Sequence, residues 1–250
     1  MRIIAGYNIK GGVGKTATVV NLAYLCAKEG HNTLVWDLDP QGAASYYFRV
    51  KPKVKGGGKR LIENKSALDE AIKGTDYHNL DLLPADFSYR NMDFLLGAKK
   101  KPENRLRKVL QPLIGEYDFV FLDCAPGISL TSENILHASN VVIVPTIPTT
   151  LSLRTLTQLI KFTKSNKLTD MDLVPLFSMV DRRKTIHRMI VNNPPKTPDP
   201  ALKNCIPYAS DVEKMGTYRQ PVGSFAPNCV AAKAYEAVWD ELKTRMKLTK

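Results

Sequence analysis

A glycine-rich run near the start of the chain has the residue types and spacing of a polyphosphate-binding loop. Residues 10–16 read K-G-G-V-G-K-T and lie between the apolar run 3–7 and an apolar helical pattern. Glycines let the backbone N–H groups turn toward an anion, and a helix that begins near Lys15 adds its positive dipole end. We expect Lys15 to bind the β- and γ-phosphates and Thr16 to ligate Mg²⁺. A glycine-rich turn without a ligand is the alternative, which the flanking strand and helix disfavour.

Three aspartates follow apolar runs that read as strands. Asp37 ends the run 33–37, Asp39 follows two residues later, and Asp123 ends the hydrophobic run 117–123. Open α/β sheets bind ligands at the carboxyl ends of their strands, so Asp37 and Asp39 are expected to face that crevice. Asp123 fits the acid that lies beside the metal shell of Thr16. A solvated Asx turn before Pro40 is the alternative for Asp39, and the neighbouring phosphate loop weighs against it.

The elements that position these residues alternate between strands and helices. Strand, loop, helix and strand over residues 3–37 make a βαβ unit, and further strands are expected at 79–85, 117–123, 141–145 and 173–181. A chain of 250 residues with 44% hydrophobic and 24% charged residues can bury one substantial core. We therefore predict a single α/β domain over residues 1–250 with the P-loop NTPase fold, a mostly parallel central β-sheet and helices on both faces.

Bulk composition indicates the compartment and one kind of partner. The four cysteines form no C-x-x-C pair, and no apolar run approaches the roughly 18 residues of a membrane span, so we expect a cytoplasmic protein. The formal charge of +12 suggests a polyanionic partner, although a solvated basic surface is the alternative. Residues 49–60 are basic and glycine-rich and are expected to form a mobile, solvated loop, with a contact to DNA as the alternative. Ser66 is expected to cap a helix that follows it.

The loop departs from the usual G-x-x-x-x-G-K-[ST] spacing, because Ile9 stands in place of the first glycine and Lys10 adds a cation. It resembles the deviant Walker A motif, K-G-G-x-G-K-[ST], of the ParA/MinD/Soj family of P-loop ATPases. The resemblance implies that Lys10 reaches across a nucleotide-sandwich dimer to the partner's phosphates. Ala17 departs from the family, which often has a second Thr there, and it cannot donate a hydroxyl hydrogen bond to the α-phosphate.

The resemblance extends over essentially the whole chain and assigns segments and roles. It implies a P-loop at 8–17, switch I at 37–42 (D-x-D-P-Q-G) and a Walker B and switch II segment at 119–128. By this resemblance the expected cofactors are ATP and Mg²⁺. The catalytic residues are Lys10, Lys15 and Asp39, and the metal-binding residues are Thr16, Asp37 and Asp123. The nucleotide-binding residues are Lys10, Gly11, Gly12, Val13, Gly14, Lys15, Thr16, Ala17, Met179, Asp181 and Pro207.

The activity that the resemblance implies is a slow, Mg-dependent partition or positioning ATPase. Its ATP-bound homodimer would bind DNA without sequence readout, and a centromere-binding or cargo-adaptor protein would stimulate hydrolysis and release. We expect a short, nucleoid-associated member without an N-terminal helix-turn-helix domain. The candidate DNA-binding residues are basic side chains of the second half of the chain: Arg182, Arg183, Lys184, Arg188, Arg219, Lys243, Arg245 and Lys247.

Two other classes of function remain open. A MinD-like relative would dock its basic, amphipathic last helix on a membrane. Tyr235, Val238 and Trp239 favour instead a helix that packs on the protein's own core, so we do not expect a membrane partner. A metabolic P-loop enzyme or an iron-sulfur reductase of related fold is the third class, and the lack of paired cysteines argues against a cluster-bearing reductase.

Overall fold

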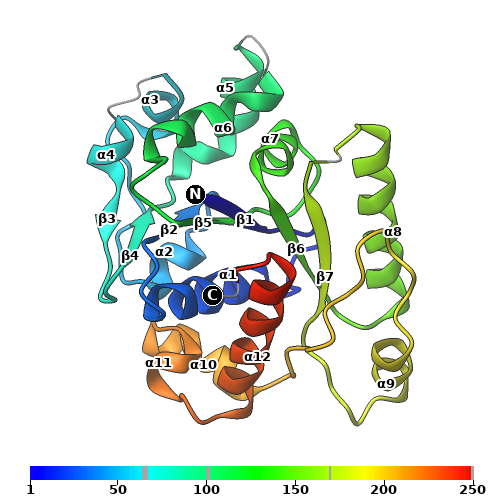
Figure 1. Cartoon of the computed structure of the whole chain (residues 1–250). Coiled ribbons are helices and arrows are strands. Elements are labelled where there is room, and N and C mark those ends of the chain that lie inside the picture. The colour runs from blue at the N-terminus through cyan, green and yellow to red at the C-terminus, as the bar shows by residue number, and fades with distance from the viewer. Residues whose placement is uncertain (64–66, 100–101, 169, 249–250) are drawn as a thin grey trace.

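A twisted seven-stranded sheet forms the centre of the computed structural model, which describes residues 1–63, 67–99, 102–168 and 170–248 (Figure 1). The strand order across the described sheet is β3-β4-β2-β5-β1-β6-β7. The strands are β1 (Arg2–Gly6), β2 (Thr33–Asp37), β3 (Lys73–Gly74), β4 (Leu80–Leu83), β5 (Phe119–Asp123), β6 (Val141–Thr146) and β7 (Asp172–Phe177).

The pairing of these strands confirms the predicted α/β fold. Every pair is parallel except β3 with β4, which is antiparallel at the edge of the sheet. Strand β5 lies between β1 and β2, so Asp123 is the register partner of Gly6 on one side and of Asp37 on the other. The phosphate loop and the two acids therefore lie together at the carboxyl ends of three neighbouring strands.

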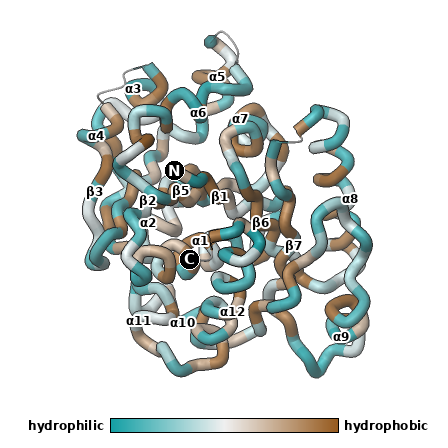
Figure 2. The backbone as a smooth tube through the Cα atoms, in the orientation of Figure 1, coloured by the Kyte–Doolittle hydropathy of each residue, from teal (hydrophilic) through white to brown (hydrophobic). Residues whose placement is uncertain are grey.

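Alternating side chains divide the core into two layers, one on each face of the sheet. On β1, Ile3 and Ala5 belong to one hydrophobic cluster, and Ile4 belongs to the other. On β2, Trp36 joins the first cluster and Val35 the second. The central strands are drawn largely in the hydrophobic colours of Figure 2, as expected for parallel strands buried on both faces.

Helices cover both faces, as the fold prediction requires. Helices α1, α10, α11 and α12 lie on one side of the sheet, and α5, α6 and α7 on the other (Figure 1). The helices are α1 (Lys15–Lys28), α2 (Ala43–Tyr47), α3 (Gly57–Glu63), α4 (Ala67–Ala71), α5 (Met92–Gly97), α6 (Arg105–Leu110), α7 (Leu130–Ala138), α8 (Thr150–Ser165), α9 (Thr185–Asn192), α10 (Ser210–Tyr218), α11 (Val222–Phe225) and α12 (Val230–Arg245). Short 3₁₀ turns are η1 (Phe87–Asn91), η2 (Pro102–Asn104) and η3 (Gln111–Leu113).

The prediction of a mobile loop over residues 49–60 is wrong. The segment turns back on itself and enters α3 at Gly57, and Val54 is buried with 4% of its surface exposed. The backbone N–H of Val54 donates to Asp86 Oδ2 at 2.8 Å, and that of Gly58 donates to Ser88 Oγ at 2.9 Å. These tertiary contacts anchor a segment whose composition alone favours flexibility. Ser66, the expected cap of α4, lies outside the described residues.

The last helix packs on the core rather than presenting a free apolar face. Tyr235, Val238 and Trp239 of α12 are buried in the cluster that also contains α1. The Trp239 indole N–H donates to Glu29 Oε2 at 3.0 Å, which fixes α12 against the end of α1. In the part of the chain that the structure describes, no helix is both long enough and apolar enough to span a bilayer.

Candidate nucleotide and metal site

The phosphate loop connects β1 to α1 in a conformation that only glycine adopts freely. Gly12 and Gly14 have φ values of 71° and 90°, in the left-handed region. A Cβ atom at Gly14 would also lie 2.9 Å from Ser178 Oγ. Helix α1 begins at Lys15, directly after Gly14. The loop therefore has the backbone curl and the helix N-terminus that bind a phosphate chain.

Asn8, which we did not single out from the sequence, holds the start of this loop. Its side chain is buried, donates through Nδ2 to the carbonyl of Pro145 at 2.8 Å and accepts from the Lys10 N–H at 2.9 Å. The carbonyl of Ile9 accepts from the Gly127 N–H at 3.0 Å, so the expected switch II segment is tied to the loop. An asparagine after a strand carries no signal of the contact with Pro145, because that partner is distant in sequence.

Asp37 and Asp123 face each other at the ends of β2 and β5, and both are fully buried. Ser45, on α2, donates to Asp37 Oδ2 through its N–H and its hydroxyl, each at 2.7 Å. Within the described residues, Asp37 Oδ1 and both carboxylate oxygens of Asp123 have no hydrogen-bond partner. Ser45 is a second site residue that the sequence did not reveal.

Burial and neighbouring negative charge raise the pKa values of both buried acids. Burial raises the pKa of Asp37 from 3.8 to about 6, and the hydrogen bonds from Ser45 act against this rise. Burial and the Asp37 charge raise the pKa of Asp123 well above its ordinary value, whereas the nearby Thr16 hydroxyl, which lies outside hydrogen-bond geometry, and the Lys15 charge lower it. Unpartnered buried carboxylates are costly unless a cation joins them.

This donor set fits a hard divalent cation. Mg²⁺ prefers oxygen ligands and commonly binds one or two carboxylates together with phosphate oxygens. Thr16, Asp37 and Asp123 supply the hydroxyl and the carboxylates. Among the described residues, no group of three or more His, Cys, Asp or Glu side chains is placed to hold a metal ion. A cation here would therefore take its other ligands from phosphate or water.

Lys15 and Lys10 occupy opposite environments in the same loop. Lys15 is buried, and its ammonium donates to the carbonyl of Lys10 at 3.3 Å, across the loop. Burial lowers the pKa of Lys15, and the charge of Asp123 raises it. The Lys10 side chain is exposed and makes no hydrogen bond or ion pair with a residue that the structure describes. Lys15 can therefore meet phosphates inside the site, whereas Lys10 is available at the surface.

Asp39 is partly exposed beyond the end of β2. Its Oδ1 accepts from the Gln41 N–H at 3.0 Å, and its carbonyl accepts from the Gly42 N–H at 2.9 Å. This is the Asx turn that we considered as the alternative for this residue. The turn leaves Asp39 beside the buried pair, since its charge raises the pKa of both Asp37 and Asp123. Its role as the residue that positions water stays a prediction.

Comparisons with known proteins identify the family. The AAA domain model AAA_31 matches residues 1–173. The chain belongs to the ParA/MinD family of P-loop ATPases. The chromosome partitioning protein ParA of Myxococcus xanthus (strain DK1622) is 33% identical over 195 residues, which cover 76% of this chain and 69% of the relative. The sporulation initiation inhibitor protein Soj of Bacillus subtilis (strain 168) is 29% identical over 240 residues, which cover 94% of this chain and 95% of the relative.

A solved structure shows the same architecture with ligands bound. Cobyrinic acid a,c-diamide synthase from Mycobacterium smegmatis, crystallised with ADP and magnesium, has a TM-score of 0.81 and 27% identity. The match covers 99% of this chain and 96% of that one. The fold of the ParA/MinD-family chain is thus shared with a metabolic enzyme, and the third class of function stays an open alternative.

The residues expected to contact adenine lie together beside the P-loop of this ATPase. Met179 Cε would be 3.9 Å from a Cβ at Gly14, and Val180 pairs with Pro207 in an isolated parallel bridge. The Asp181 carboxylate, however, is bound by the Arg183 guanidinium through two contacts of 3.0 Å. This pairing lowers the pKa of Asp181 and offsets the charge of Arg183. The adenine assignment stays a prediction.

Ala17 is the position where this ATPase departs from the family motif. Its side chain is partly buried and packs against the cluster that contains α1 and α12. Its carbonyl accepts from Asn21 Nδ2 at 2.7 Å, and Asn21 Oδ1 accepts from the Val222 N–H at 2.8 Å. Ala17 thus contributes packing and a backbone carbonyl, and only its N–H is left to meet a phosphate.

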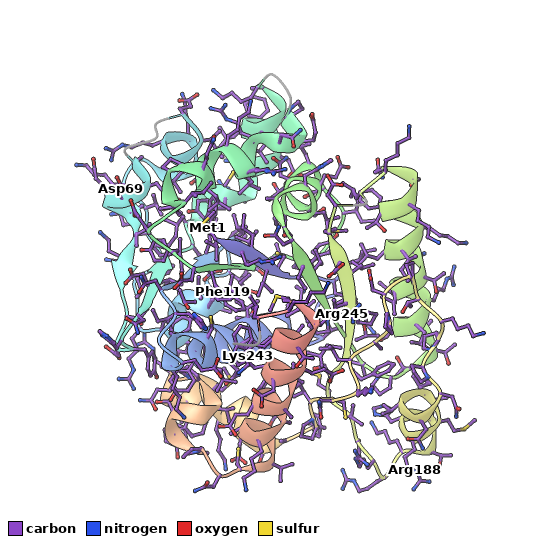
Figure 3. All side chains as sticks on the ribbon, viewed as in Figure 1. Met1, Asp69, Phe119, Arg188, Lys243 and Arg245 are labelled. Carbon is purple, nitrogen blue, oxygen red and sulfur yellow. The ribbon has the colours of Figure 1, made fainter. Side chains whose placement is uncertain are left out.

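The candidate DNA-binding residues of this ATPase do not form one patch. Figure 3 shows Arg188 on α9, well away from Lys243 and Arg245 on α12. Lys243 pairs with Glu29 at 2.6 Å and Asp240 at 2.9 Å, and Arg245 donates to the carbonyl of Pro200 at 2.7 Å. Both side chains therefore stabilise the fold locally.

The other candidates fall into two groups. Arg219 stacks 4.5 Å above the ring of Tyr46 and donates to its carbonyl at 3.1 Å. The remaining side chains are exposed, and they are Arg182, Arg183, Lys184, Arg188 and Lys247. Most of these belong to α9 or to the turn that precedes it, so that segment holds most of the accessible charge among the candidates.

Proposed function

We propose that this chain is a partition or positioning ATPase that binds ATP with Mg²⁺, dimerises around the nucleotide and holds DNA without reading its sequence. The observation that supports it most is the pair of buried acids, Asp37 and Asp123, whose carboxylate oxygens, apart from the Oδ2 that Ser45 binds, lack hydrogen-bond partners beside a P-loop lysine. The relatives named ParA and Soj support the partition role. A bound Mg²⁺ would supply the positive charge that neutralises phosphate oxygens in phosphoryl transfer.

In this proposal, one set of residues binds the phosphates and another holds the metal ion. The loop N–H groups and the N-terminus of α1 would bind the phosphates, and Lys15 would neutralise the β- and γ-phosphates from inside the site. Thr16, Asp37 and Asp123 would hold the metal, with Ser45 fixing the orientation of Asp37.

Hydrolysis needs a positioned water and charge neutralisation at the transferring phosphoryl group. Asp39 lies at the carboxyl end of β2 beside the buried acids, where it can orient the water. The exposed Lys10 cannot serve its own buried site as Lys15 does, so we assign it to the phosphates of a second copy of the chain. Release of DNA would then follow hydrolysis stimulated by a partner protein.

A comparison of Lys10→Ala with wild type and with the exposed-lysine control Lys28→Ala tests this function. With a non-hydrolysable ATP analogue, wild type and control should sediment as dimers and bind unrelated duplexes with similar affinity. Lys10→Ala should keep most of its analogue affinity in calorimetry but sediment as a monomer and bind DNA weakly. Equal DNA binding by wild type in ADP and in the analogue would contradict the proposal, as would a monomer in the analogue.

A further inference from the structure

A second concentration of positive charge lies at the edge of the sheet, outside the nucleotide site. An open hollow of about 600 Å³ is lined by Lys51, Lys53, Lys55 and Lys73, together with Glu70. We call it the lysine hollow. It lies between the segment that follows α2 and the α4–β3 connection, at the left of Figure 1, and Asp69 in Figure 3 marks α4.

The backbone on both sides of the lysine hollow is held by hydrogen bonds within the protein. The buried Val54 stands between two of its lysines and donates its N–H to Asp86 at 2.8 Å. The Lys53 N–H donates to the carbonyl of Lys51 at 2.8 Å, which closes a tight turn around Pro52. On the opposite wall, Lys73 Nζ donates to the carbonyl of Glu70 at 2.8 Å. The backbones that carry these lysines are thus held in place before any ligand arrives.

Carboxylates around the lysine hollow are engaged by other groups. Both oxygens of Glu70 accept from Arg60, at 2.9 and 3.0 Å. Asp76 pairs with Arg49 at 3.3 Å. Asp86 accepts the backbone N–H groups of Val54 and Ser88; against burial, hydrogen bonds from Ser88 and Val54, followed by the charge of Lys53, lower its pKa. In the described part of the chain, no carboxylate lies within ion-pair distance of Lys51, Lys53 or Lys55. The hollow therefore keeps a net positive charge that an external anion can neutralise.

We propose that the lysine hollow contacts the phosphate backbone of duplex DNA, as a surface separate from α9. The inference rests on the proposed function for the presence of DNA as a partner. Lysine ammonium groups bind phosphates as point charges and read no sequence, as that function requires. The described lining contains no aromatic ring on which single-stranded bases could stack, and only the small apolar side chains Val50 and Ala71 to anchor an acidic protein segment.

The test compares two triple variants that remove the same charge. Lys51→Gln, Lys53→Gln and Lys55→Gln alter the lysine hollow, and none of these residues belongs to the nucleotide site. Lys161→Gln, Lys164→Gln and Lys167→Gln alter exposed lysines at the end of α8. Affinity for one duplex is measured against salt concentration, with ADP and with a non-hydrolysable ATP analogue. Circular dichroism and nucleotide calorimetry verify that both variants fold and bind nucleotide.

Three lost phosphate contacts should lower the slope of log K against log salt by about 2 to 3, and the affinity by about 100-fold at roughly 100 mM salt. The α8 variant should keep the wild-type slope. The inference is overturned if the hollow variant keeps the wild-type slope, or if both variants lower the slope equally. It is also overturned if the hollow variant loses affinity for poly-glutamate, an acidic polypeptide, but keeps its affinity for the duplex. Loss of the ATP dependence with a persisting difference between the variants would refute the proposed function and leave the lysine hollow as a DNA contact.

Discussion

Replacing Asp37 by asparagine should stabilise the nucleotide-free protein, although it damages the metal site. Burial raises the pKa of Asp37 from 3.8 to about 6, so at neutral pH its charge costs the folded state about 3 kcal/mol. An amide keeps an oxygen that accepts from Ser45, and it turns an N–H donor toward the unpartnered Asp123. Weaker hydrogen bonds to a neutral acceptor offset about 1 kcal/mol of the gain.

The net gain of about 2 kcal/mol should raise Tm by about 4–8 °C at pH 7.5 in a chain of this length. The pH dependence has a definite sign. An acid whose pKa is raised by folding binds more protons in the folded state than in the unfolded state. The free energy of unfolding of wild type therefore decreases as the pH rises from about 4 to about 6. The difference between Asp37→Asn and wild type should therefore grow across this window and level off above it.

Differential scanning calorimetry without nucleotide, from pH 4 to 8, measures this difference. Asp172→Asn, at the exposed start of β7, serves as the matched control and should follow wild type. With Mg²⁺ and a non-hydrolysable ATP analogue the order should reverse, because wild type gains the metal and the variant loses a ligand. A variant that melts below wild type without nucleotide at pH 7.5, or a difference independent of pH, would refute the account of the buried pair.

Three further substitutions test neighbouring residues. Lys15→Ala should weaken binding of the ATP analogue at least about 100-fold in calorimetry, since the phosphates lose their buried cation; near-normal affinity would contradict this. Asp39→Ala should bind the analogue normally yet release no phosphate in a turnover assay, whereas normal hydrolysis would remove its assignment to the attacking water. Ser45→Ala should lower the free energy of unfolding, measured in urea, by about 1–3 kcal/mol, because the hydroxyl donates to Asp37 and accepts from the Ala85 N–H. An unchanged urea midpoint would show that these two hydrogen bonds contribute no net stability.

The sequence was sufficient for the features that repeat along the chain or depend on local spacing. Apolar runs that end in Asp37 and Asp123 predicted parallel strands with acids at their carboxyl ends, and the glycine pattern predicted the turn into α1. Each of these follows from backbone geometry over a few residues. The burial of the two acids and their register pairing could be predicted only from the strand order, and no local sequence pattern contains that order.

The features that could not be predicted depend on partners distant in sequence. Asn8 fixes the P-loop through Pro145, and Ser45 joins Asp37 to Ala85, two residues after the end of β4. The segment 49–60 failed as a loop prediction because Val54 finds Asp86 and a place in the core. The composition of a segment predicts its conformation in isolation. These contacts depend instead on residues that the fold brings next to the segment.

Charge inside the site and charge at its rim impose different requirements on a ligand. Asp37 and Asp123 need a cation in the interior, and Lys15, whose pKa burial lowers, cannot neutralise both. Under the proposed function, Lys10 at the surface would contact an anion in a second subunit's site. Mg-ADP would meet the first need, and under the proposed function the γ-phosphate would meet the second. We therefore expect ADP and an ATP analogue, each with Mg²⁺, both to raise Tm, while only the analogue shifts the sedimentation coefficient to that of a dimer. A dimer of the same stability in Mg-ADP would show that subunit pairing does not depend on the γ-phosphate.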